Sequence, residues 1–230
     1  MNMNKYVLII VVALFAAAAI SVFGADVPTE TTNLRSGTMQ KKLEAVHNLG
    51  TADDAVAAAA LLKEYPQQKD LNMKIQMVES LGHSRGQDRT IRPALEKIMN
   101  DVKTPKEVRQ TAIQSISQLG GAASVNTLAG VFANQKEDID VRMAAGAELG
   151  LYLTTDKAFI TLRDSLKDTN PRIREQAVCS LGLAFSQIMR QRVTPLLQAM
   201  QSDNNAAVAA RAGQMLEVIR PKVSPKPNKK

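Results

Sequence analysis

A chain of 230 residues with a single cysteine forms no internal disulfide, which excludes a disulfide-stapled extracellular domain. The net charge of +7 does not indicate nucleic-acid binding, because residues 220–230 hold five of the positive charges and Lys5 holds one more, so the region between them carries only +1. Aromatic residues make up 3% of the chain, too few for the stacking surfaces that bind single-stranded bases. No nucleic-acid partner is therefore expected.

The first 24 residues have the pattern of a targeting segment. Lys5 precedes the run 6–23, which carries no charge, and Val22-Phe23-Gly24 before Ala25 is typical of a cleavage site. The apolar run is longer than most signal-peptide cores and close to the length that spans a bilayer. Residues 1–24 are thus predicted to be a cleaved signal peptide or, alternatively, a membrane anchor formed by residues 6–25. Both interpretations predict export, to a periplasmic or extracellular location.

Residues 25–37 are predicted to be a linker, residues 38–220 a folded repeat domain, and residues 221–230 a basic tail. Proline at positions 221, 225 and 227 prevents helix formation in the tail, which is predicted to be disordered. Its lysines predict weak, salt-sensitive association with anionic components of the envelope, or a purely solubilising role.

The domain contains an internal repeat marked by the pair Leu-Gly. A basic residue stands seven positions before most of these leucines, and it recurs at intervals of 32, 35, 33, 32 and 35 residues when Ala209 is placed in the last unit. The positions of this basic column are Lys42, Lys74, Arg109, Arg142, Arg174 and Ala209. A period of this size predicts stacked supersecondary units.

Apolar residues occupy fixed offsets from the basic column. In the unit of Arg174 they are Ile173, Ala177, Val178 and Leu181, at −1, +3, +4 and +7, which share one face of an α-helix. The glycine after each leucine, such as Gly150 or Gly182, is predicted to end this first helix in a left-handed conformation.

A second helix is predicted in each unit, at residues 55–64, 91–100, 124–133, 157–166 and 193–201. Polar breaks with Asp, Asn or Pro separate the units, and Pro105 and Pro171 suit the first turn of the helix that follows each. The predicted fold is all-α: a right-handed α-solenoid of about five to six stacked helix pairs.

Units such as DIDVRMAAGAELG and LKDTNPRIREQAVCSLG resemble HEAT repeats, most closely the short variety also called PBS-lyase HEAT-like repeats. The resemblance covers residues 37–220. It implies a scaffold that binds other proteins, and a subset of such proteins are chromophore lyases or assist them. It also implies a structural role for Arg109, Arg142 and Arg174, which would pair with acidic or carbonyl groups of their own or an adjacent unit. The alternative for these three arginines is an anion-binding ladder.

Two turns between helices are unusually apolar. They are predicted to lie side by side and to form a partner-binding edge, whereas the alternative is that they pack beneath their own helices. The residues concerned are Leu151, Tyr152, Leu153, Leu183, Phe185, Ile188 and Met189.

Other polar candidates give weaker signals. The turn 83–90 contains His83, Arg85, Asp88 and Arg89 and is either a polar contact loop or a solvated turn. Neither histidine has partners at metal-ligand spacing, so no metal site is expected. Cys179 shares its repeat position with His47 and with Glu79, Gln114, Ala147 and Gln214, and such a mixed column indicates a tolerated, partly buried thiol.

The sequence lacks a phosphate-binding loop, a nucleophile triad and paired carboxylates. The function predicted is therefore an exported HEAT-like scaffold or adaptor that mediates protein–protein interaction in the cell envelope. It is expected to have no enzymatic activity, no cofactor and no small-molecule substrate. The alternatives are a PBS-lyase-like enzyme that handles a chromophore and an adaptor anchored in the membrane.

Overall fold

The computed structural model describes residues 26–220, in which there are twelve α-helices, two short 3-10 helices and no strand. The all-α prediction is confirmed. The predicted targeting segment and the basic tail lie outside the described residues. Within the described part, no helix has the length and apolar character needed to cross a bilayer. The chain divides into two compact units, unit 1 up to Ile91 and unit 2 from Arg92.

Unit 1 contains the helix pair α3 and α4, the first helix α5 of the next pair, and one further helix at its N-terminal side. That helix corrects the sequence prediction, because the segment 25–37 is not a linker: α2 packs on α3 and α4, with Leu34 fully buried. Arg35 on α2 also donates to Glu64 at the end of α4. The elements of unit 1 are α2 (Val27–Ser36), α3 (Met39–Thr51), α4 (Ala55–Glu64), η2 (Tyr65–Gln67), α5 (Leu71–His83) and η3 (Arg85–Gln87).

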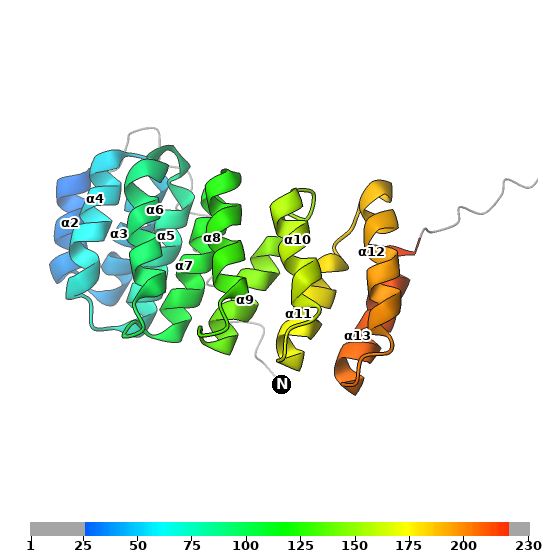
Figure 1. The fold of residues 1–230 in the computed structure, drawn as a ribbon. Helices are drawn as coiled ribbons and strands as arrows, with labels where there is room; N and C mark the ends of the chain where they lie inside the picture. The colour runs from blue at the N-terminus through cyan, green and yellow to red at the C-terminus, as the bar shows by residue number, and fades with distance from the viewer. Residues whose placement is uncertain (1–25, 221–230) are drawn as a thin grey trace, which may run out of the picture. The chain divides into compact units, whose positions relative to one another are not determined.

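Unit 2 begins within α6 and arranges the remaining helices in two rows (Figure 1). The first helices α7, α9, α11 and α13 pack on one another in sequence, and the second helices α8, α10 and α12 form the other row. The elements are α6 (Asp88–Asn100), α7 (Lys106–Leu119), α8 (Gly121–Ala133), α9 (Ile139–Gly150), α10 (Asp156–Ser165), α11 (Pro171–Leu181), α12 (Gln187–Met200) and α13 (Ala206–Ile219).

The helix starts in unit 2 are set by local sequence. Asp138, Asn170 and Asn205 each accept hydrogen bonds from backbone N–H groups of the following first turn, which satisfies donors that have no partner within the helix. Pro171 is the first residue of α11, as predicted, since proline lacks only an N–H that this position does not use. Pro105 stands one residue before α7 begins.

The predicted core face of the first helices is confirmed. In α11, Ile173, Ala177, Val178 and Leu181 are all fully buried. The corresponding residues of α9 are Val141, Ala145, Gly146 and Leu149, all buried. In α9 and α11 the offsets −1, +3, +4 and +7 therefore mark the face that packs inside the solenoid.

The prediction for the Leu-Gly glycines is wrong in most units. Gly150 lies inside α9, and Gly182 has φ −65°, an ordinary right-handed value. These glycines make room for the next unit: a Cβ on Gly150 would lie 2.8 Å from Leu183 Cδ1, and one on Gly182 would lie 2.5 Å from Met215 Sδ. Among the glycines of residues 26–220, only Gly120 and Gly121 adopt a positive φ, at 76° and 77°.

Candidate functional site

Three arginines of the basic column tie successive helix pairs of unit 2 together. Arg142 donates from Nε to the carbonyl of Phe132 at 2.9 Å and pairs with Asp168 in the next interhelical turn. Arg109 makes the same two contacts with the carbonyl of Met99 and with Glu137. Each guanidinium thus joins the preceding second helix to the turn of the following unit.

Arg174 completes this ladder. It contacts the two carboxylate oxygens of Asp203 at 2.8 and 2.7 Å and the carbonyl of Asp168 at 2.9 Å. These hydrogen bonds from Arg174 hold the pKa of Asp203 below its usual range. The structural interpretation of the arginines is confirmed. The anion-binding alternative is wrong, because the side chains of Arg109, Arg142 and Arg174 are only 5%, 4% and 12% exposed and already bind carboxylates.

Two turns lie at the other end of these first helices, 151–155 after α9 and 182–186 after α11. Leu183 in the second turn packs directly against Gly150 at the end of α9, so the two turns lie next to each other. Nearby, the guanidinium of Arg192 on α12 stacks over the ring of Phe159 on α10 at 3.8 Å, which holds the two second helices together.

The apolar edge is defined here as Leu151, Phe185 and Ile188. Their exposed fractions are 69%, 78% and 69%, values typical of surface polar residues and high for large apolar ones. Leu151 follows the last residue of α9, and Phe185 and Ile188 flank the start of α12. These three of the seven residues predicted for the edge are exposed.

The other residues predicted for this edge point inward. Leu153 is 3% exposed and Met189 is 6% exposed, so both are core residues and the packing alternative is correct for them. Leu183 is half-buried. Tyr152 is also half-buried and donates its hydroxyl to the carbonyl of Ser117, which fixes the first turn to α7.

The polar turn 83–90 is built into unit 1. The N–H of Gly86 donates to Oδ1 of Asp53 at 2.9 Å, and Asp53 itself has a positive φ of 46°, a conformation that Asp tolerates better than most residues. His83 and Arg89 are exposed, and Asp88 is half-buried at the start of α6. Arg85 is the first residue of η3.

The thiol and the histidines form no reactive site in the described part. Cys179 is partly buried, and desolvation raises the pKa of its thiol, which disfavours the nucleophilic thiolate. His47 and His83 are both exposed. No cluster of His, Cys, Asp and Glu able to hold a metal ion occurs among residues 26–220.

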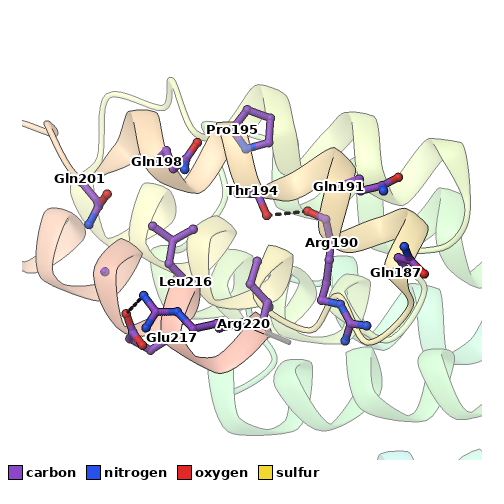
Figure 2. Close-up of a pocket in the computed structure, with 12 residues that line it drawn as sticks. Gln187, Arg190, Gln191, Thr194, Pro195, Gln198, Gln201, Leu216, Glu217 and Arg220 are labelled. Carbon is purple, nitrogen blue, oxygen red and sulfur yellow. Dashed lines mark hydrogen bonds and ion pairs between the residues drawn. The ribbon is translucent and has the colours of Figure 1, made fainter. Parts of the chain in front are cut away.

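One hollow was not predicted from the sequence. It lies between α12 and α13 and is lined by glutamine side chains of α12 together with Leu216 of α13 (Figure 2). The glutamines recur at helical spacing, a signal that is visible in the sequence, but only the structure shows which helix stands opposite them.

Antiparallel helix pairs that repeat at this period and stack in two rows define an α-solenoid. Residues 132–217 match the family model described as HEAT repeats. This stretch includes Arg142, Arg174 and the apolar edge, and over it the resemblance to HEAT repeats seen in the sequence is confirmed. Such repeats are generally a fold for protein interaction.

Comparison with curated proteins finds no match. Among solved structures, the chain is similar to human deoxyhypusine hydroxylase, with 16% identity, 84% of each chain covered and a TM-score of 0.46. A computationally designed armadillo repeat protein for modular peptide recognition gives 17% identity, 84% and 99% coverage and a TM-score of 0.46. The complex of CpcE and CpcF of phycocyanin lyase from Nostoc gives 13% identity, 87% and 97% coverage and a TM-score of 0.44.

Proposed function

We propose that this chain is a HEAT-repeat scaffold that binds a protein partner through the apolar edge and works in the cell envelope. The observation that carries the proposal is the exposure of Leu151 and Phe185 on two adjacent turns and of Ile188 in the first turn of α12. Binding, and not catalysis, is the activity proposed.

The energetics favour a partner of apolar character. Burying a large apolar side chain stabilises a complex by about 1.5–3 kcal/mol, so three exposed ones provide a substantial binding contribution. Because Tyr152 and Leu183 hold the two turns in place, little conformational entropy is lost when a partner binds. Aromatic and aliphatic anchors on a rigid support are typical of interaction hot spots.

The proposed location is supported by the N-terminal sequence alone. Lys5, the uncharged run 6–23 and the small residues at 24 and 25 favour export, with a membrane anchor as the alternative. N-terminal sequencing of the mature protein distinguishes the two: a start at Ala25 supports cleavage, and a start at or near Met1 supports the anchor. Envelope association that is lost on deletion of residues 221–230, and lost in high salt, supports attachment through the tail.

The edge is tested by site-specific photocrosslinking in intact cells. A photoreactive amino acid at position 185 is expected to give a discrete crosslinked species, and Leu151→Asp in the same chain is expected to abolish it. The matched control is Val102→Asp, since Val102 is 80% exposed in another turn of unit 2 and lies outside the edge. Loss of the species with Val102→Asp, or its persistence with Leu151→Asp, contradicts the proposal.

A chromophore-handling activity makes a separate prediction. Protein purified from the cells that naturally produce it would then absorb visible light, or would alter the absorbance of an added bilin. The scaffold proposed here shows neither.

A further inference from the structure

The groove between α12 and α13 has an open volume of about 910 Å³. Within the described residues, α13 is a first helix with no second helix after it. Its +4 and +7 residues, Gly213 and Leu216, are half-exposed, whereas the equivalents on α11, Val178 and Leu181, are fully buried. The groove therefore lies where other units place their second helix.

One wall of the groove is a stripe of neutral polar side chains along α12. They recur at intervals of four, three, four and three residues, which keeps them on one face, and they extend over about 21 Å. The amide side chains form no hydrogen bond with any other residue of the range 26–220. The members of this amide stripe are Gln187, Gln191, Thr194, Gln198 and Gln201, the glutamines being exposed and Thr194 half-buried. An amide carries both donors and an acceptor, so a row of amides complements a second copy of itself.

The charges of the groove lie at its two ends. Figure 2 shows Arg190 near Gln187 toward one end, and the Glu217–Arg220 pair at the end of α13, across the groove from Gln198 and Gln201, toward the other. Glu217 pairs with Arg220, at 2.7 Å and with both side chains largely exposed, while the guanidinium of Arg190 has no carboxylate partner among the described residues. A two-fold axis through the middle of the groove reverses its direction and places Arg190 opposite Glu217 of a second copy.

The basic tail of the chain fits the groove poorly. The groove holds two arginines and one glutamate, and residues 221–230 carry four lysines and no acidic residue. The tail has no carboxylate to pair with Arg190, whereas a second copy of the groove brings Glu217, so the tail is disfavoured as the occupant. Solvent alone is also a poor occupant, because Gly213 and Leu216 leave apolar surface on the floor.

We propose that two copies of this chain associate through this groove, with the amide stripes antiparallel and Thr194 near the two-fold axis. The contact is isologous: Arg190 of each copy faces Glu217 of the other, and the amides pair across the axis. Self-association is distinct from partner binding at the apolar edge.

Cysteine crosslinking of the purified full-length chain tests the geometry. Cys179→Ser removes the native thiol, and Thr194→Cys then places a cysteine near the axis. A short bismaleimide is expected to give a covalent dimer of this variant at low micromolar concentration. The control is Ala199→Cys in the same background, since Ala199 is exposed on α12 but does not line the groove. Equal crosslinking at both positions, or none at 194, overturns the proposal.

A charge swap tests whether a second copy of the chain occupies the groove. Arg190→Glu alone is expected to weaken self-association about tenfold in sedimentation equilibrium, because it places carboxylates of the two copies opposite each other. Arg190→Glu with Glu217→Arg is expected to restore it. A chain that is monomeric throughout, or a double variant as weak as the single one, overturns the proposal and leaves the groove to solvent or to another protein.

Discussion

The two units of the chain use the same repeat but different residues at its basic position. In unit 2, Arg109 and Arg142 are buried, Arg174 is largely buried, and all three pair with carboxylates. In unit 1, Lys42 forms no ion pair with a described residue, and the ammonium of Lys74 lies 5.4 Å from the ring centre of Tyr65. Lysine is a strongly hydrated point charge without a planar fork, so it does not reproduce the arginine contacts.

The turns differ in the same way. In unit 1 the turn after α3 contains Asp53 and Asp54, and Asp53 holds the backbone of the next turn. In unit 2 the equivalent turns expose Leu151 and Phe185. The repeat therefore sets where the helices lie, while the residues at its variable positions decide which helix pairs are joined by ion pairs and which surface is available for binding.

The largest expected effect comes from breaking the ladder. Arg142→Met leaves Asp168 buried without its partner, and removing one member of a buried pair costs about 3–5 kcal/mol. Lys74→Met, at the equivalent position of unit 1, is expected to cost less than about 1 kcal/mol. Urea denaturation monitored by circular dichroism measures both, and equal losses at the two positions contradict the difference drawn between the units.

In both units, glycines at the ends of the first helices are expected to allow close packing against the next helix pair. Gly50→Ala in unit 1 brings a Cβ to 2.5 Å from Ser80 Cβ, and Gly150→Ala in unit 2 brings one to 2.8 Å from Leu183 Cδ1. Each overpacked contact is expected to cost about 1–3 kcal/mol. Gly130 is an exposed residue of α8, and a Cβ at this position would meet no atom within 4 Å. Gly130→Ala is therefore expected to stabilise the helix by up to about 1 kcal/mol. If Gly130→Ala destabilises as much as the other two, close approach is not the role of these glycines.

Low pH is expected to reduce the contribution of Asp203 to the free energy of unfolding of unit 2. The pKa of Asp203 is lowered in the folded state, so its contribution to the free energy of unfolding is present above the ordinary Asp pKa of about 4 and is lost as pH falls through the folded value. Asp203→Asn is expected to lower the free energy of unfolding by about 1–2 kcal/mol at neutral pH. The difference from the native chain should shrink steadily below pH 4. A difference that is independent of pH would show that the charge of Asp203 is not what matters.

Much of the fold was predictable, because periodicity reports directly on burial. The arginine column, the core offsets and all five predicted second helices come from residue spacing alone. Helix α2 was missed because its sequence, VPTETTNLRS, has a single buried residue, Leu34, and so carries no apolar period. The role of Gly150 was misread because spacing locates a glycine but does not show which side chain from the next unit approaches it.

The candidate site was predictable only in part. The apolar composition of the two turns is evident in the sequence, but whether Leu151 or Leu153 faces outward depends on the path of a short irregular turn. The groove needs the structure, since the amide stripe gains meaning only from the half-exposed floor of α13 opposite it.

The smallest expected effect on stability belongs to the apolar edge, and it tests the central claim most directly. Phe185→Asp is expected to change the free energy of unfolding by less than about 0.5 kcal/mol, because an exposed side chain away from special contacts contributes little to folding. The measurement is urea denaturation of this variant alongside photocrosslinking from position 188 in cells. Unchanged stability with loss of the crosslinked partner is the predicted result. A loss of several kcal/mol, or a partner that still crosslinks, would show that Phe185 belongs to the fold and not to a binding surface.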